Sequence, residues 1–119
     1  MARILIVDDE KMICDEFSEI LEEENHTVDV AYGGEEALKK VQDKDFDLIF
    51  LDVLMPRMEG REVFERIKQI KKTPVAIMSG YMPPNKEREV LSLGAVACLR
   101  KPLDLERVRS LLRSLEKKK

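Results

Sequence analysis

Four short runs of this sequence are apolar almost throughout, and each is followed by a charged or hydroxyl-bearing residue. The runs cover residues 4–7, 48–51, 75–78 and 96–99. Runs of this kind suit strands that are covered on both faces, as in a parallel sheet between helices. The run 27–31 alternates polar and apolar residues instead, which predicts a strand at the edge of the sheet with one wetter face.

The segments between these runs carry apolar residues at helical spacing. The first contains Ile13, Phe17, Ile20 and Leu21, and Asp9 is in position to cap its start. Four more helices are predicted around residues 37–41, 63–70, 90–93 and 105–115, with Gly94 ending the fourth and Asp104 opening the last. Five strands alternating with five helices predict a parallel sheet between two helical layers, in one α/β domain over residues 1–119.

The composition fits one cytoplasmic domain. The 119 residues hold 21 Lys and Arg against 24 Asp and Glu, a formal net charge of −3, so the basic surplus typical of nucleic-acid binding is missing. No apolar stretch approaches the roughly 18 residues of a membrane helix, so we expect neither a membrane anchor nor a signal peptide. Cys14 and Cys98 lie in apolar or amphipathic runs, which favours reduced, buried thiols in the cytoplasm.

Polar residues interrupt the predicted strands at their carboxyl ends. Asp8 and Asp9 follow the first strand, Asp52 follows the third, Ser79 closes the fourth and Lys101 follows the fifth. Each of them alone is explained by a turn or a helix cap. Together they favour a functional pocket, because the carboxyl ends of parallel strands lie along one edge of the sheet, where ligands bind.

Three carboxylates held close together repel one another unless a cation or a proton is taken up. Hard oxygen ligands with room for water suit Mg²⁺, so we expect this ion. Asp52 is the best candidate for a nucleophile towards phosphorus, while Asp8 and Asp9 are better placed as metal ligands. Lys101 would pair with one phosphoryl oxygen as a point charge, and Ser79 would donate a hydrogen bond to another.

These residues and their neighbours resemble the receiver domain of two-component response regulators over essentially the whole chain. The resemblance is carried by Ile6-Val7-Asp8-Asp9-Glu10, Leu51-Asp52-Val53-Leu54-Met55-Pro56 followed by Glu59-Gly60, Met78-Ser79-Gly80, and Gly94-Ala95 leading to Leu99-Arg100-Lys101-Pro102. It implies a flavodoxin-like, doubly wound (βα)5 three-layer sandwich with strand order 2-1-3-4-5.

The resemblance implies a signalling phosphoacceptor that catalyses only its own phosphorylation and dephosphorylation. Asp52 would accept a phosphoryl group from a sensor histidine kinase or phosphotransfer protein. Phosphorylation would then switch binding to a downstream protein target or to an effector domain outside this chain, without direct contact to nucleic acid or membrane.

The family's site residues carry over position by position. Direct magnesium ligands fall on Asp9, Asp52 and the backbone carbonyl of Leu54, with Asp8 acting through water. Ser79 matches the switch hydroxyl. Lys101 matches the phosphate-pairing lysine, and the family makes the Lys101–Pro102 peptide bond cis.

One position departs from the family pattern. The family places Tyr or Phe where this chain has Cys98, and that ring swings inward when the switch hydroxyl engages phosphate. We hypothesise that engagement of Ser79 is signalled here by the loop 80–84, with Tyr81 as a candidate for the moving ring. The alternative is that Cys98 only fills a smaller space in the core.

The resemblance also suggests where the histidine donor docks, namely beside the pocket at Met12, Ile13 and Glu16. Met12 is the best candidate for an exposed contact, whereas Ile13 is better explained as part of the core.

Two other functional classes stay open from the sequence. One is a phosphorylation-independent interaction module, to which the missing aromatic at Cys98 gives some weight. The other is a metal-dependent aspartyl phosphohydrolase, although Asp52-Val53-Leu54 lacks the second aspartate that such enzymes usually carry two positions on.

Overall fold

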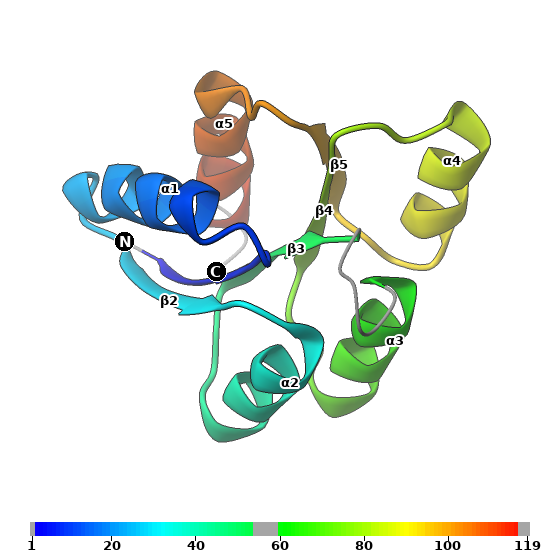
Figure 1. Cartoon of the computed structure of the whole chain (residues 1–119), viewed down its shortest axis with the longest axis horizontal. Helices are drawn as coiled ribbons and strands as arrows, with labels where there is room; N and C mark the ends of the chain where they lie inside the picture. The colour runs from blue at the N-terminus through cyan, green and yellow to red at the C-terminus, as the bar shows by residue number, and fades with distance from the viewer. Residues whose placement is uncertain (1, 54–59, 117–119) are drawn as a thin grey trace.

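Five parallel strands form one sheet at the centre of the molecule (Figure 1). The computed structural model describes residues 2–53 and 60–116. The strands are β1 (Arg3–Val7), β2 (Thr27–Ala31), β3 (Leu48–Asp52), β4 (Val75–Ser79) and β5 (Ala97–Arg100). Their order is β2-β1-β3-β4-β5, and all four neighbouring pairs are parallel. The flavodoxin-like order implied by the resemblance is therefore confirmed.

Five helices cover the two faces of the sheet. They are α1 (Lys11–Glu23), α2 (Gly34–Asp43), α3 (Gly60–Ile70), α4 (Pro84–Ser92) and α5 (Leu105–Glu116). Helices α1 and α5 lie on one face, and α2, α3 and α4 lie on the other (Figure 1). The predicted three-layer sandwich is confirmed.

Alternate residues of each inner strand enter different cores, which explains why these strands read as continuous apolar runs. In β1, Ile4 and Ile6 join the core beneath α1 and α5, whereas Leu5 and Val7 join the core beneath α2 and α3. All four side chains are buried. The run 27–31 is an edge strand, as predicted, and most of its residues are only half-buried.

The element boundaries differ from the predicted ones in small ways. Strand β5 begins one residue later than expected, and Val96, which precedes it, is 41% exposed. Strand β3 includes Asp52, which was expected just beyond its end. Strand β4 ends with Ser79, as predicted. As predicted, Gly94 adopts a left-handed conformation after α4, with φ of 111°, which a residue without a Cβ adopts at little cost.

The predicted cap of α1 is wrong, while that of α5 is confirmed. The N-cap of α1 is Glu10, without a side-chain cap. Instead of Asp9, which is exposed, the Oδ1 atom of Asp8 accepts the Glu10 N–H at 3.0 Å. At α5, the Oδ1 atom of Asp104 accepts the Glu106 N–H at 3.0 Å.

Gly60 provides a test of how tightly α3 meets the sheet. A Cβ at this position would lie 2.2 Å from the Cα of Val53, so the backbone would have to move. We expect Gly60→Ala to lower the free energy of unfolding by about 2–3 kcal/mol, as other overpacked sites do, measured by urea denaturation. The matched control is Gly33→Ala, where a Cβ meets nothing within 4 Å; because Gly33 is the N-cap of α2, only the smaller loss from a poorer cap residue is expected. Equal stabilities of the two variants would contradict this packing argument.

Candidate functional site

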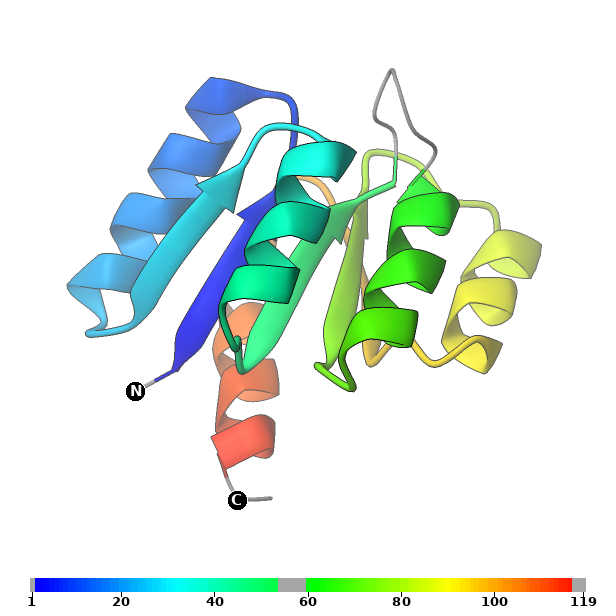
Figure 2. The ribbon, with the colours of Figure 1, turned by 90° about the horizontal axis from the view of Figure 1, so that it is seen from below.

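The carboxyl ends of the strands lie together along one edge of the sheet (Figure 2). Asp8 comes directly after β1 and Asp52 is the last residue of β3. These two strands are neighbours, and Val7 pairs with Leu51. Asp8 and Asp52 are the next residues along their chains, so they lie next to each other at the carboxyl edge of the sheet. Both are buried, with 0% of Asp8 and 3% of Asp52 exposed.

Lys101 joins these two carboxylates from the loop after β5. Its Nζ atom donates to Oδ2 of Asp8 at 2.6 Å and to Oδ2 of Asp52 at 2.9 Å. The lysine side chain is 15% exposed, and the Oε1 atom of Glu10 lies 3.6 Å from Nζ. The structure therefore brings Asp8, Asp52 and Lys101, which are far apart in the sequence, into one cluster.

Two opposing effects act on the Lys101 ammonium. Burial favours the neutral amine, but hydrogen bonds and charge from Asp8 and Asp52 outweigh it, so the pKa of Lys101 is raised above its usual 10.5. The ammonium is therefore retained at neutral pH. Its contribution to stability is complete below the ordinary lysine pKa and is lost only as the pH rises through the higher folded-state value.

Three carboxylates of the described residues could hold a metal ion. Asp8, Glu10 and Asp52 each offer an oxygen, and these oxygens lie within 4.8 Å of one another. Asp9 is exposed and is not a member of this group. Leu54, the fourth predicted ligand, lies outside the described residues. A set of hard, anionic oxygens fits Mg²⁺, so the residues present suit the ion that the sequence predicts.

Glu10 is the residue of this cluster to which the sequence reasoning gave no role. It stands two residues after Asp8 as the N-cap of α1. The hydrogen bond from its N–H to Asp8 turns the chain at this point and keeps Glu10 beside the buried pair. Its position next to two aspartates was the available sequence clue, but three consecutive acidic residues do not show which of them face the pocket.

The switch candidate Ser79 is held by the loop that follows it. Its hydroxyl donates to the carbonyl oxygen of Tyr81 at 2.7 Å and accepts the N–H of Tyr81 at 3.2 Å. Only 2% of Ser79 is exposed. The N–H of Lys101 donates to the backbone carbonyl of Ser79 at 2.8 Å, which ties the lysine loop to the end of β4.

Cys14 lies beneath the acidic cluster and has a structural role. Its thiol donates to the backbone carbonyl of Asp8 at 3.2 Å. Burial, with the nearby Asp8 charge, raises the pKa of Cys14 to about 12, so the thiol stays protonated. Both cysteines of the chain are free and buried, as expected.

A groove of about 250 Å³ lies beside the cluster, between α1 and the loop from β5 to α5. It is lined by Ile13, Glu16, Phe17, Ile20, Lys101, Pro102, Leu103 and Leu105. The Lys101–Pro102 peptide bond at its edge is cis. Met12, at the start of α1, is 76% exposed, whereas Ile13 is half-buried.

The sequence that forms this site matches a known protein family. The family model described as the response regulator receiver domain matches residues 4–113. The chain belongs to this family. The expectation from the sequence motifs is thereby confirmed.

Known receiver domains are similar over nearly the whole chain. The receiver domain of a CheY-like protein from Methanospirillum hungatei has a TM-score of 0.90 at 32% identity, covering 100% of this chain and 99% of that one. TrrA from Thermotoga maritima, in complex with Mg²⁺-BeF, has a TM-score of 0.85 at 34% identity, covering 97% and 99%.

Response regulator ArlR of Staphylococcus saprophyticus is 35% identical over 117 residues. The alignment covers 95% of this chain and 53% of that protein. The chain therefore spans about half the length of the curated relatives it matches. Among the described residues, no helix is long and apolar enough to cross a membrane.

Replacing Lys101 tests the balance of charge in the receiver site. Lys101→Met would leave two buried carboxylates without their cation, so we expect it to lower the free energy of unfolding by about 3 kcal/mol or more. The measurement is urea denaturation at pH 7 in the presence of a chelator.

The double variant Lys101→Met/Asp52→Asn provides the control, because it also removes one of the two charges. Its stability should lie well above the value obtained by adding the two single effects. Additive effects, or a stable single variant, would show that Lys101 does not neutralise this pair.

Proposed function

We propose that this receiver domain accepts a phosphoryl group on Asp52 from a phosphohistidine, with the help of Mg²⁺, and that this modification switches binding to a partner. The observation that carries the proposal is the Lys101 ammonium, held 2.6 Å from Asp8 and 2.9 Å from Asp52 at the carboxyl edge of the sheet. A cation at this place can pair first with the carboxylate of Asp52 and then with the negatively charged oxygens of an incoming phosphoryl group.

The chemistry that we propose is the transfer of a phosphoryl group between two side chains. A carboxylate oxygen of Asp52 attacks phosphorus, a P–O bond forms, and the P–N bond to the donor histidine breaks. The electron pair of that bond stays on the imidazole, which takes up a proton. Lys101 moves its hydrogen bond from Asp52 to a phosphoryl oxygen, and Ser79 donates a hydrogen bond to another. Attack by water on the resulting acyl phosphate resets the domain.

Asp8 and Asp52, with Glu10 beside them, would hold the magnesium ion. The family resemblance adds Asp9 and the backbone carbonyl of Leu54. When bound, the ion supplies positive charge that neutralises the phosphoryl oxygens during transfer. The TrrA structure, which is in complex with Mg²⁺-BeF, supports this assignment by similarity.

The partners that we propose are a histidine kinase or phosphotransfer protein as the donor, and a downstream protein or effector domain as the target. Because the matched relatives are about twice as long as the aligned region, an attached effector domain is one form that the output can take. A cytoplasmic location agrees with both partners.

Phosphorylation by a small donor tests the proposal. With Mg²⁺ and acetyl phosphate, we expect wild-type protein to gain one phosphoryl group by intact-mass analysis, and Asp52→Asn to gain none, because the nucleophile is gone. Addition of a chelator should also abolish the adduct. Asp29→Asn is the matched control, because it removes an aspartate that pairs with Lys44 at 2.7 Å on the edge strand.

The same experiment separates the competing functions. Absence of an adduct on the wild type would favour a phosphorylation-independent module. Rapid turnover of many phosphate esters would favour a phosphohydrolase. An adduct that persists in Asp52→Asn would place the phosphoryl group elsewhere and contradict the proposed acceptor.

We further propose that the donor domain docks on the groove beside α1, with Met12 as an exposed contact. The groove joins the apolar surface of α1 to Lys101 itself, so a donor seated there has direct access to the cluster. The flexible thioether of Met12 suits an adaptable contact with a partner.

Met12→Asp tests this docking surface. With the most active phosphorylated histidine domain found in a panel, we expect the transfer rate to fall about tenfold or more, since a charge replaces an apolar contact. The rate with acetyl phosphate should not change, because a small donor needs no docking surface. A parallel fall with both donors, or no fall with the protein donor, would contradict the docking role.

A further inference from the structure

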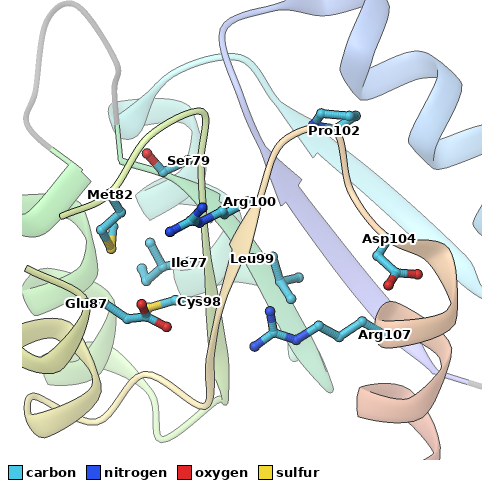
Figure 3. A pocket seen from close by; sticks show the side chains of 10 residues that line it. All are labelled: Ile77, Ser79, Met82, Glu87, Cys98, Leu99, Arg100, Pro102, Asp104 and Arg107. Carbon is cyan, nitrogen blue, oxygen red and sulfur yellow. The ribbon is translucent and has the colours of Figure 1, made fainter. Parts of the chain in front are cut away.

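A hollow of about 210 Å³ lies next to Ser79, at the β5 edge of the sheet between α4 and α5 (Figure 3). Ile77, Cys98 and Leu99 supply its apolar lining from β4 and β5, and Met82 borders it from the loop after β4. Arg100 and Arg107 are among the charged residues around it. Glu87 and Asp104 are charged residues of the lining as well, so the apolar part beside Ile77 and Cys98 is where an uncharged side chain would pack.

We infer that, when Ser79 turns to a phosphoryl group, the side chain of Met82 moves into this hollow and covers Cys98. The inference rests on the proposed function, and it names the residue that carries the switch in this chain. The side chain of Met82 would thus take the place of the aromatic ring that the family carries at the position of Cys98.

The first support is the way in which Ser79 is held. The Ser79 hydroxyl donates to the carbonyl of Tyr81 and accepts its N–H, so it holds both backbone polar groups of Tyr81. A hydroxyl that donates to a phosphoryl oxygen cannot donate to Tyr81 at the same time. Engagement of phosphate therefore releases Tyr81, and Met82 is the next residue of the chain.

The second support is the position of Met82. It borders both the Cys98 hollow and a second groove that is also lined by Tyr81 and Val90. Its side chain is half-buried against the core beneath α2 and α3. Entry into the Cys98 hollow would place its apolar surface against Ile77 and Cys98, and the unbranched thioether adapts readily to an irregular space.

Tyr81 fits this role less well. Its side chain is 67% exposed, and it lines the second groove but not the Cys98 hollow. Entry of the tyrosine ring would also require burial of its hydroxyl, which needs a hydrogen-bond partner there. The structure therefore favours Met82 over Tyr81 as the moving residue.

Alkylation of Cys98 reports whether the hollow is filled. Cys98 is 8% exposed and lines the hollow, whereas Cys14 is 0% exposed beneath the acidic cluster. Burial raises the pKa of the Cys98 thiol, so labelling with N-ethylmaleimide is slow and is followed at mildly alkaline pH by mass spectrometry of peptides. With Mg²⁺ and beryllofluoride, we expect the labelling rate of Cys98 to fall about fivefold or more, because a covered thiol is inaccessible.

Variants identify the side chain that covers the thiol. In Met82→Ala the fall on adding beryllofluoride should be lost, whereas in Tyr81→Ala and in the control Leu91→Ala it should persist. A wild-type rate that does not fall, or a fall that persists in Met82→Ala, would overturn the inference. Loss of the fall in Tyr81→Ala alone would assign the role to the tyrosine ring and overturn it as well.

Two further measurements complete the test. Fluorine NMR of the same samples shows whether beryllofluoride is bound: absence of a bound resonance would overturn the proposed function itself, whereas a bound resonance with unchanged labelling would overturn only the role of Met82. In wild-type protein with methyl-labelled methionine, new proximity between the Met82 methyl group and the Cys98 β-protons is expected on activation. Its absence would contradict the inference without any substitution.

Discussion

The contact between Lys101 and the two buried aspartates is the constraint on which the site depends. Two carboxylates cannot be buried side by side at neutral pH unless a cation accompanies them, because their repulsion and loss of hydration would favour protonation. Lys101 provides that cation from a loop 93 residues away from Asp8 in sequence. The charge that stabilises the two buried carboxylates would also pair with the phosphoryl group in the transfer that we propose, so one side chain would meet a structural and a chemical requirement.

The fold explains why such a cluster can form at the edge of the sheet. The inner strands are buried on both faces, so their side chains provide two continuous cores and leave no room for polar groups along their length. Polar side chains can enter only where the strands end. Since all strands run in the same direction, Asp8, Asp52, Ser79 and Lys101 reach one edge, where Lys101 contacts both aspartates through its side chain and Ser79 through its backbone.

The same edge also connects the site to the rest of the molecule. Ser79 binds the backbone of Tyr81, and the residue after it borders the hollow beside Cys98. A smaller residue at position 98 changes what has to move, since open space replaces a ring. Under the inference above, the departure from the family pattern would not remove the proposed switch but would transfer it to the loop after β4.

The sequence by itself determined the number and type of elements, the edge position of 27–31 and the family, because burial on both faces leaves an unbroken apolar run and polar residues mark each strand end. It also indicated that the polar residues would converge. Only the tertiary structure showed that the Glu10 carboxylate lies close to those of the two buried aspartates, since three consecutive acids look alike until the turn after β1 orients them. It alone revealed the partner of Ser79 and the hollow beside Cys98, because such contacts join segments whose spacing is set by packing and not by local sequence.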